Sequence, residues 1–164
     1  MERIWAPWRL EYVENASRAG DCILCAFPRE GRDAERYILH QGRHAFVMLN
    51  AFPYSNGHLM VAPYRHTAQL GELDAAESLD ILNLVRAGVE ALGAAYKPDG
   101  FNIGINMGRV AGAGIEDHIH VHVVPRWNGD TNFMAVVGDT RVIPASLQAA
   151  YERLRPHFAT GDPT

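Results

Sequence analysis

Three histidines alternate with isoleucine and valine in the second half of the chain, at His118, His120 and His122. Because successive side chains of a strand point to opposite faces, these imidazoles would share one face, about 6.6 Å from one to the next. The β-branched residues between them would form an apolar face that packs on a core. The pattern predicts a strand whose histidine side meets solvent or a ligand, and which ends at Pro125, a residue without an N–H to donate.

An imidazole triplet of this kind is compatible with three roles. It could be a solvated polar face, although Thr, Lys or Glu would serve as well there. Its rings could instead converge on one metal ion such as zinc. Alternatively, one imidazole could be a nucleophile while its neighbours orient it and move protons. The triplet alone leaves the last two roles open.

The segment 106–115 leads into the histidines and contains three glycines. Glycine lets main-chain N–H groups approach a ligand closely, and such turns often hold phosphate groups. A phosphoryl group held there by N–H groups and by Asn106 would lie within reach of His120. An ordinary tight connection between two elements is the alternative.

The chain has two cysteines, Cys22 and Cys25. In a reducing compartment, this spacing indicates half of a metal site or a redox pair before a structural disulfide. A tetrahedral zinc ion would need two further ligands from elsewhere in the chain.

The size and composition of the chain limit its class. A length of 164 residues with 48% hydrophobic residues predicts a single domain over 1–164 with a substantial core. A net charge of −4 lacks the basic character typical of nucleic-acid binders. No stretch resembles a signal peptide or a membrane span, so we expect a cytoplasmic protein without a membrane partner. Residues 1–20 form an aromatic arm, with Trp5 and Trp8, that we expect to pack on the body or on a partner subunit.

Secondary-structure patterns indicate an antiparallel α+β domain. Strands are expected over 37–40, 45–50, 58–63, 101–106 and the histidine stretch, with a further extended segment over 133–137. The third of these is apolar on both faces, which is typical of a central strand. The short connections between them predict an antiparallel sheet of about five strands.

One long helix and a C-terminal helix are expected on this sheet. Asp74 and Glu77 form a capping-box pattern that starts the long helix, and residues 97–100 end it. Its buried stripe is predicted to be Leu82, Val85, Val89, Leu92 and Tyr96. Pro144 is well placed for a first helical turn, so a C-terminal helical extension is expected over 144–158.

Several blocks of the chain together resemble one family. The alternating histidines, preceded by a glycine-rich loop and followed by Pro125 and Arg126, resemble the signature of the histidine triad family of nucleotide hydrolases and transferases. Segment 57–66 is similar to that family's second block, and segment 101–108 to its third. The resemblance covers roughly residues 20–127, and ordered blocks at the right separations are more specific than one short motif.

The resemblance implies a covalent mechanism. His120 would attack the α-phosphorus of a nucleotide and form a nucleotidyl-histidine, while His122 would donate a hydrogen bond to a phosphate or leaving-group oxygen. Asn106 matches the family's phosphate-binding asparagine, and Asn50 falls where the family contacts the ribose. His58 lies near the nucleotide in related enzymes, with a histidine that merely caps the strand start as the alternative.

The resemblance also implies a structural zinc ion and a particular branch of the family. In the bacterial branch, the zinc ligands correspond to Cys22, Cys25, His66 and His118, all present here. Such a site would tie the N-terminal loop to the catalytic strand.

The loop before the first histidine departs from many family members. Where those have a glutamine and a serine, this chain has residues 111–117, a segment about one residue longer. Side-chain donors are thereby replaced with main-chain donors at Gly112, Ala113 and Gly114. This variant looks most like the bacterial diadenosine tetraphosphate phosphorylases of the family. We hypothesise that the loop leaves room for inorganic phosphate as acceptor, giving ADP and ATP, whereas water would give AMP and ATP.

Two other classes of function stay open at this point. The three histidines could hold a catalytic zinc ion whose bound water attacks the substrate. The protein could also be a non-enzymatic module that binds adenine nucleotides without turnover. For both the covalent mechanism and the zinc mechanism, the substrate is expected to be an adenine dinucleotide polyphosphate. The resemblance also implies a homodimer, because family members usually pair through their sheets and long helices.

Overall fold

The computed structural model describes residues 22–130 and 145–158. Five antiparallel strands form one sheet in the order β1-β2-β3-β5-β4, which confirms the predicted α+β class. Their bounds are β1 (Ile38–Gln41), β2 (Ala45–Leu49), β3 (Leu59–Pro63), β4 (Gly100–Ile105) and β5 (Val121–Arg126). β3 is central, as its two apolar faces predict.

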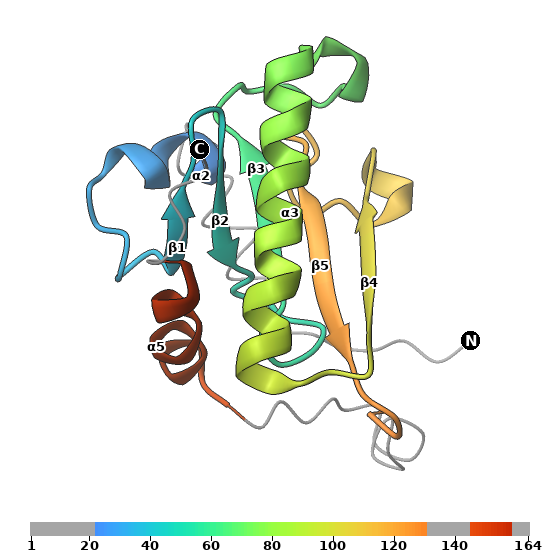
Figure 1. Ribbon diagram of the computed structural model, residues 1–164. Coiled ribbons are helices and arrows are strands. Elements are labelled where there is room, and N and C mark those ends of the chain that lie inside the picture. The colour runs from blue at the N-terminus through green and yellow to red at the C-terminus, as the bar shows by residue number, and fades with distance from the viewer. Residues whose placement is uncertain (1–21, 131–144, 159–164) are drawn as a thin grey trace.

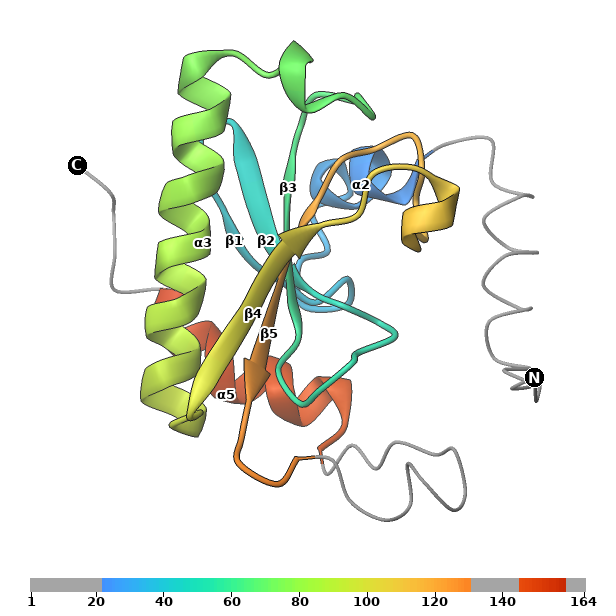
Figure 2. The same ribbon diagram turned by 90° about the vertical axis from the view of Figure 1, so that its right-hand side faces the viewer.

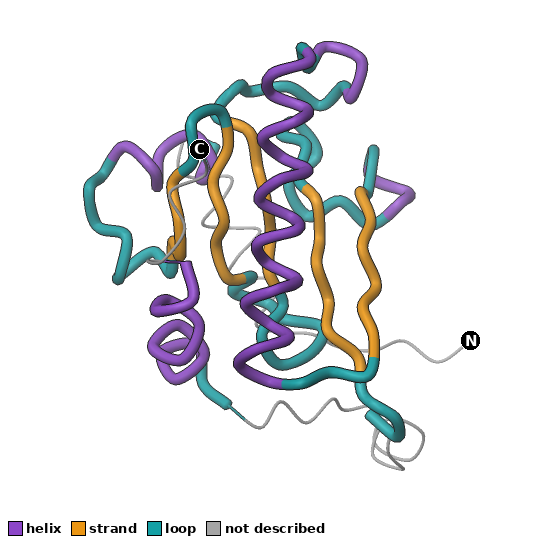
Figure 3. The backbone as a smooth tube through the Cα atoms, viewed as in Figure 1, coloured by secondary structure: helices purple, strands orange, loops and turns teal. Residues whose placement is uncertain are grey.

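Helices cover both faces of the sheet unequally. The long helix α3 (Ala75–Tyr96) crosses one face and α5 (Leu147–Phe158) packs beside it, while the short helix α2 (Ile23–Ala26) lies on the opposite side (Figures 1 and 2). Short 3₁₀ turns occupy Phe27–Arg29, Leu70–Glu72 and Arg109–Ala111. The turn at Arg109–Ala111 interrupts the long connection between β4 and β5 (Figure 3).

The core has two parts, one on each face of the sheet. The larger lies under α3 and α5 and includes Leu59, Val61, Val121 and Val123 from the central strands. The smaller joins the other face of β2 and β3 to Leu24 of α2. Burial on both faces fixes the central strands, and with them the residues at their ends.

The start of α3 matches the predicted capping box. The Asp74 carboxylate accepts a hydrogen bond from the Glu77 main-chain N–H at 2.8 Å, and the Glu77 carboxylate accepts one from the Asp74 main-chain N–H at 2.9 Å. The buried stripe was partly wrong, because Leu82 is 64% exposed. At about 100° per residue only one of two adjacent apolar residues faces the sheet, and here it is Ile81.

The histidine stretch also differs from its prediction. β5 begins at Val121, so only His122 of the triplet is in the strand, and the strand continues through Pro125 to Arg126. Pairing with β3 stops at Val123, and beyond it β5 pairs with β4 alone, with Pro125 opposite Phe101. A proline is tolerated where only one neighbouring strand is present.

Some predicted elements lie outside the described residues. These are the aromatic arm over 1–20, the extended segment over 133–137 and the start of the C-terminal helix at Pro144. The single-domain boundaries stay a prediction. Among the described residues, no helix is both long and apolar enough to cross a membrane.

Gly57, between β2 and β3, provides a test of how tightly α3 packs on the sheet. Its φ is +78°, and a Cβ there would lie 2.9 Å from Cδ2 of Leu92 and 3.2 Å from Cε2 of Tyr96. We predict that Gly57→Ala lowers the free energy of unfolding by about 1–3 kcal/mol in urea denaturation. Gly31→Ala is the matched control, because Gly31 also has a positive φ, +66°, and a Cβ there meets nothing within 4 Å. Equal losses in the two variants would contradict the packing described.

Candidate functional site

Four histidine side chains cluster on and beside the sheet face that α3 does not cover. They are His58 just before β3, His118 and His120 in the segment that leads into β5, and His122 within β5. All four are buried, with His120 only 3% exposed, so of the two expected surroundings of the histidine side, solvent or a ligand, bulk solvent does not apply. Loops fold over this face, and the ring of Tyr54 contacts His58 and His122 at centroid distances of 4.5 and 5.7 Å.

The His120 ring has a defined tautomer. Its Nδ1 lies 2.8 Å from the main-chain carbonyl oxygen of His118. A carbonyl oxygen can only accept, so Nδ1 carries the proton and Nε2 keeps its lone pair. Burial lowers the pKa of His120 and thereby favours the neutral ring, and this effect outweighs the hydrogen bond to His118, which raises the pKa. A neutral imidazole with an available Nε2 is a competent nucleophile.

His58 and His122 form a buried pair. Nε2 of His58 lies 2.9 Å from Nδ1 of His122, and the rings are 5.1 Å apart. Burial, with smaller contributions from His122 and His120, lowers the pKa of His58 to about 3. Burial and then His120 lower the pKa of His122 to about 4. Both rings are therefore neutral near pH 7, and Nε2 of His122 is a buried polar atom without a partner among the described residues.

Of the other residues predicted to bind nucleotide, Asn50 contacts this cluster. Asn50 is buried, and its amide lies 3.4 Å from Nδ1 of His58. Asn106 is partly buried just after β4. In the glycine-rich loop, Ala113 is buried, whereas a Cβ added at Gly112 or Gly114 would meet nothing within 4 Å. The loop backbone is thus open to a ligand, and its role in holding phosphate stays a prediction.

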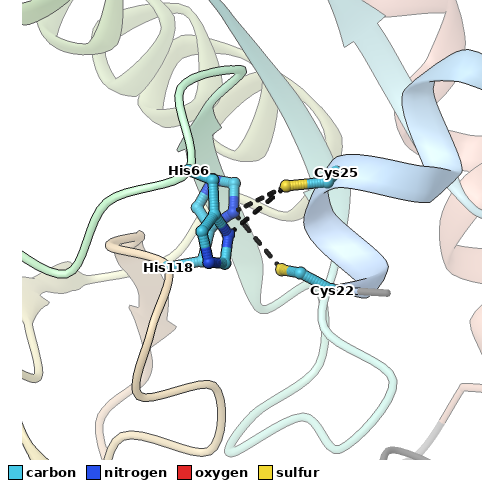
Figure 4. A group of neighbouring side chains, drawn as sticks. All are labelled: Cys22, Cys25, His66 and His118. Carbon is cyan, nitrogen blue, oxygen red and sulfur yellow. Dashed lines mark hydrogen bonds between the residues drawn. The ribbon is translucent and has the colours of Figure 1, made fainter. Parts of the chain in front are cut away.

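A second cluster brings together Cys22, Cys25, His66 and His118 (Figure 4). Their ligand atoms all lie within 4.8 Å of one another. Nδ1 of His118 is 3.3 and 3.5 Å from the two sulfur atoms, and Nδ1 of His66 is 3.4 Å from that of Cys25. A tetrahedral zinc ion with bonds of about 2.0–2.3 Å separates its ligands by roughly 3.3–3.8 Å, so the donor set and its spacing fit a metal ion.

The orientation of His118 also suits metal binding. Its Nε2 lies 2.8 Å from the main-chain carbonyl oxygen of Pro63 and must donate to it. Nδ1 therefore faces the thiols with a lone pair. Metal-bound histidines in proteins are oriented by such an outer hydrogen bond.

Two supporting contacts were not predicted from the sequence. The main-chain N–H of Ile119 donates to the carbonyl oxygen of Thr67 at 2.7 Å, which fixes the segment between His118 and His120. Nε of Arg65 lies 2.7 and 2.9 Å from the two carboxylate oxygens of Glu77, which is 7% exposed. The capping-box pattern identified Glu77 as a helix cap, but no sequence signal identified its ion-pair partner.

Comparison with known proteins identifies relatives along nearly the whole chain. Residues 32–129 match the HIT domain. The chain is 34% identical over 166 aligned residues to the AP-4-A phosphorylase of Mycobacterium tuberculosis, covering 97% of this chain and 85% of the relative. It is 33% identical to an adenosine 5′-monophosphoramidase of Schizosaccharomyces pombe, covering 81% of this chain and 95% of that protein.

Solved structures agree with this relationship. A zinc-bound histidine triad family protein from Mycobacterium smegmatis superposes with a TM-score of 0.68 at 28% identity, covering 85% of this chain and 94% of that one. A hypothetical histidine triad nucleotide-binding protein from Sulfolobus tokodaii gives a TM-score of 0.67 at 25% identity, covering 84% and 92%. With the domain match and the buried histidine cluster, these similarities show that the chain belongs to the histidine triad, or HIT, family.

Proposed function

We propose that this protein cleaves dinucleoside polyphosphates, in particular diadenosine tetraphosphate, through a covalent nucleotidyl intermediate on His120. The observation that carries the proposal is the pinned tautomer of His120, whose Nδ1–H is held by the His118 carbonyl so that Nε2 is free to attack. The similarity to a mycobacterial AP-4-A phosphorylase supports the choice of substrate.

The proposed reaction has two displacements at one phosphorus atom. Nε2 of His120 attacks the α-phosphorus, and the bond to the bridging oxygen breaks to release ATP. An oxygen of inorganic phosphate then attacks the same phosphorus, which breaks the P–N bond and releases ADP. His122 donates from Nε2 to a phosphate or leaving-group oxygen, because that nitrogen is buried and has no hydrogen-bond partner within residues 22–130 and 145–158.

The remaining predicted residues would hold the substrate. Asn106 and the main-chain N–H groups of Ala113 and Gly114 would bind phosphate oxygens. The N–H of Gly112 donates to the Arg109 carbonyl at 3.0 Å, so Gly112 would contribute by turning the loop toward the ligand with its φ of +89°. Asn50 would contact the ribose. Small side chains in this loop leave space for inorganic phosphate beside His120.

A hydrolase is the second candidate. The identity of 33% to a yeast adenosine 5′-monophosphoramidase favours it, because water would then replace phosphate as the acceptor. The substrate would be a nucleoside phosphoramidate or the same dinucleoside polyphosphate.

We predict that diadenosine tetraphosphate yields ADP and ATP with inorganic phosphate present, whereas AMP and ATP would indicate the hydrolase. His120→Ala should lower turnover by about 10⁴-fold or more, because the nucleophile is lost. Chromatographic product analysis measures both. His157→Ala is the control, since that histidine is exposed on α5. Full turnover by the His120 variant would contradict the proposed intermediate.

We also propose that Cys22, Cys25, His66 and His118 bind a structural zinc ion. The distances among their ligand atoms fit zinc, and one similar solved structure is zinc-bound. The ion would join α2 to the segment that carries His120 and would stabilise the fold. The reduced thiols that such a site needs suit the cytoplasmic location expected from the sequence.

Zinc removal should therefore loosen the fold. We predict about one zinc ion per chain by mass spectrometry, and a fall in the melting temperature of about 5 °C or more when a chelator is added. A variant with both Cys22→Ser and Cys25→Ser should lack zinc and show no further fall with chelator. Bound zinc in that variant, or an unchanged melting temperature on zinc loss, would contradict the site.

We further propose a homodimer formed through α3 and the edge strand β4. Leu79 and Leu82 on α3 are 59% and 64% exposed, and Ile103 on β4 is 50% exposed. β4 has one neighbour in the sheet and lies at its edge (Figure 1). Exposed apolar groups beside an unpaired strand edge are typical of an interface.

A charge placed in this surface should separate the subunits. We predict that the wild type sediments as a dimer and that Leu82→Arg shifts it to a monomer, because a buried unpaired charge is costly. Leu70→Arg is the control, since Leu70 is 50% exposed in the turn before α3. A monomeric wild type would refute the proposed interface.

A further inference from the structure

Two hydrogen bonds tie the residues that lead into β5 to the segment that follows β3. Nε2 of His118 donates to the carbonyl oxygen of Pro63 at 2.8 Å. The main-chain N–H of Ile119 donates to the carbonyl oxygen of Thr67 at 2.7 Å. The second bond reaches the main chain directly beside His120, so Thr67 faces the segment that carries the proposed nucleophile.

The peptide unit between His118 and Ile119 connects Thr67 to the ring of His120. The N–H of this unit donates to Thr67, and its carbonyl oxygen accepts from Nδ1 of His120 at 2.8 Å. A peptide unit is planar and rigid, so a rotation that changes one of these bonds also changes the other. Two hydrogen bonds in series through one amide strengthen each other as well. The Thr67 carbonyl therefore holds the plane that orients the His120 ring.

The hydroxyl of Thr67 holds that carbonyl in place. Its Oγ1 accepts a hydrogen bond from the main-chain N–H of Gln69 at 3.0 Å and donates one to the Glu72 carboxylate. Thr67 is 4% exposed, whereas its neighbours in segment 65–72 are exposed or half-buried. A buried hydroxyl is costly unless it is hydrogen-bonded, and valine would fill the same space without that cost. The hydroxyl is explained by the turn over 67–69 that it closes.

We propose that Thr67 is a positioning residue for His120. Its hydroxyl fixes the turn, and the turn presents the Thr67 carbonyl to the N–H of Ile119. The peptide unit held in this way keeps the proton of His120 on Nδ1 and leaves Nε2 to attack. The purpose of this arrangement rests on the proposed function, in which His120 is the nucleophile.

Three substitutions test the role of the hydroxyl. Thr67→Val keeps the branched shape and removes the hydroxyl, whereas Thr67→Ser keeps the hydroxyl and removes a methyl group. Glu72→Ala removes only the acceptor of the hydroxyl, and because Glu72 is exposed this variant should fold. Ser78→Ala is the control, since it removes an exposed hydroxyl from α3.

The first measurement follows the hydrogen bonds by NMR in the zinc-supplied protein. We expect a coupling across the bond between the ¹⁵N of Ile119 and the carbonyl ¹³C of Thr67, and a His120 ring with its proton on Nδ1. Thr67→Val should weaken this coupling, speed exchange of the Ile119 amide about tenfold and add the Nε2–H tautomer of His120. Glu72→Ala should shift the same signals less, while Thr67→Ser and Ser78→Ala resemble the wild type. Unchanged exchange at Ile119 in Glu72→Ala, or in folded Thr67→Val, would overturn the proposal.

The second measurement is turnover of diadenosine tetraphosphate with inorganic phosphate, together with zinc content. Thr67→Val should lower kcat by about tenfold with KM nearly unchanged, because outer hydrogen bonds of this kind orient a group without touching the substrate. Thr67→Ser should recover most of the rate, and all variants should hold as much zinc as the wild type.

Two outcomes of the second measurement would overturn the positioning role. Equal losses in Thr67→Val and Thr67→Ser would reduce Thr67 to packing, and zinc loss in Thr67→Val would assign the effect to the metal cluster. An inactive wild type whose Ile119 and His120 signals respond as expected would refute the proposed function and leave the hydrogen-bond chain from Thr67 to His120 supported.

Discussion

The arrangement of the site depends on the hydrogen bonds made by one residue, His118. Its Nε2 donates to the Pro63 carbonyl at the end of β3, and its Nδ1 faces the two thiols. Its own main-chain carbonyl accepts from Nδ1 of His120. The orientation of the nucleophile is thereby tied, within two residues, both to the sheet and to the proposed zinc cluster.

The sheet provides the rigid base for these contacts. β2 and β3 are buried on both faces, and α3 is fixed by a capping box and by the Arg65–Glu77 ion pair beside His66. Since Arg65 remains 48% exposed in its side chain, solvent weakens this ion pair, and its main effect is to set the geometry between β3 and α3. The cluster of four histidines is held in place mostly by the packing of the sheet, and its hydrogen bonds set the orientation of the rings.

Much of this architecture was predictable because it follows from local patterns. Hydrophobic patterns predicted the five strands and the helices α3 and α5, but not the four-residue helix α2, and the capping box located the start of α3. The errors fall where the environment decides. Leu82 and Ile81 are both strongly apolar, and only packing on the sheet determines which side chain is buried. Pro125 is tolerated in β5 because pairing with β3 extends only to Val123.

The residues of the site could be predicted from the sequence, but their orientation and some of their partners could not. The resemblance to the family identified His58, but its orientation depends on a main-chain N–H at Tyr54, a group that every non-proline residue has. Arg65 and Glu77 are 12 residues apart, and no spacing rule joins them. The metal cluster joins Cys22 and Cys25 to two histidines that lie 41 to 96 positions away. The resemblance to the family named those histidines, whereas the spacing of the cysteines alone could not.

Burial of the His58–His122 pair has a consequence for acid tolerance. Both rings titrate in the unfolded chain near their ordinary pKa of 6.5, but only at about 3 and 4 when folded. Between these values the unfolded state binds more protons than the folded one, so acidification below about pH 6.5 favours unfolding. The two histidines therefore lower the stability of the folded protein as the pH falls below about 6.5, before most surface carboxylates begin to protonate.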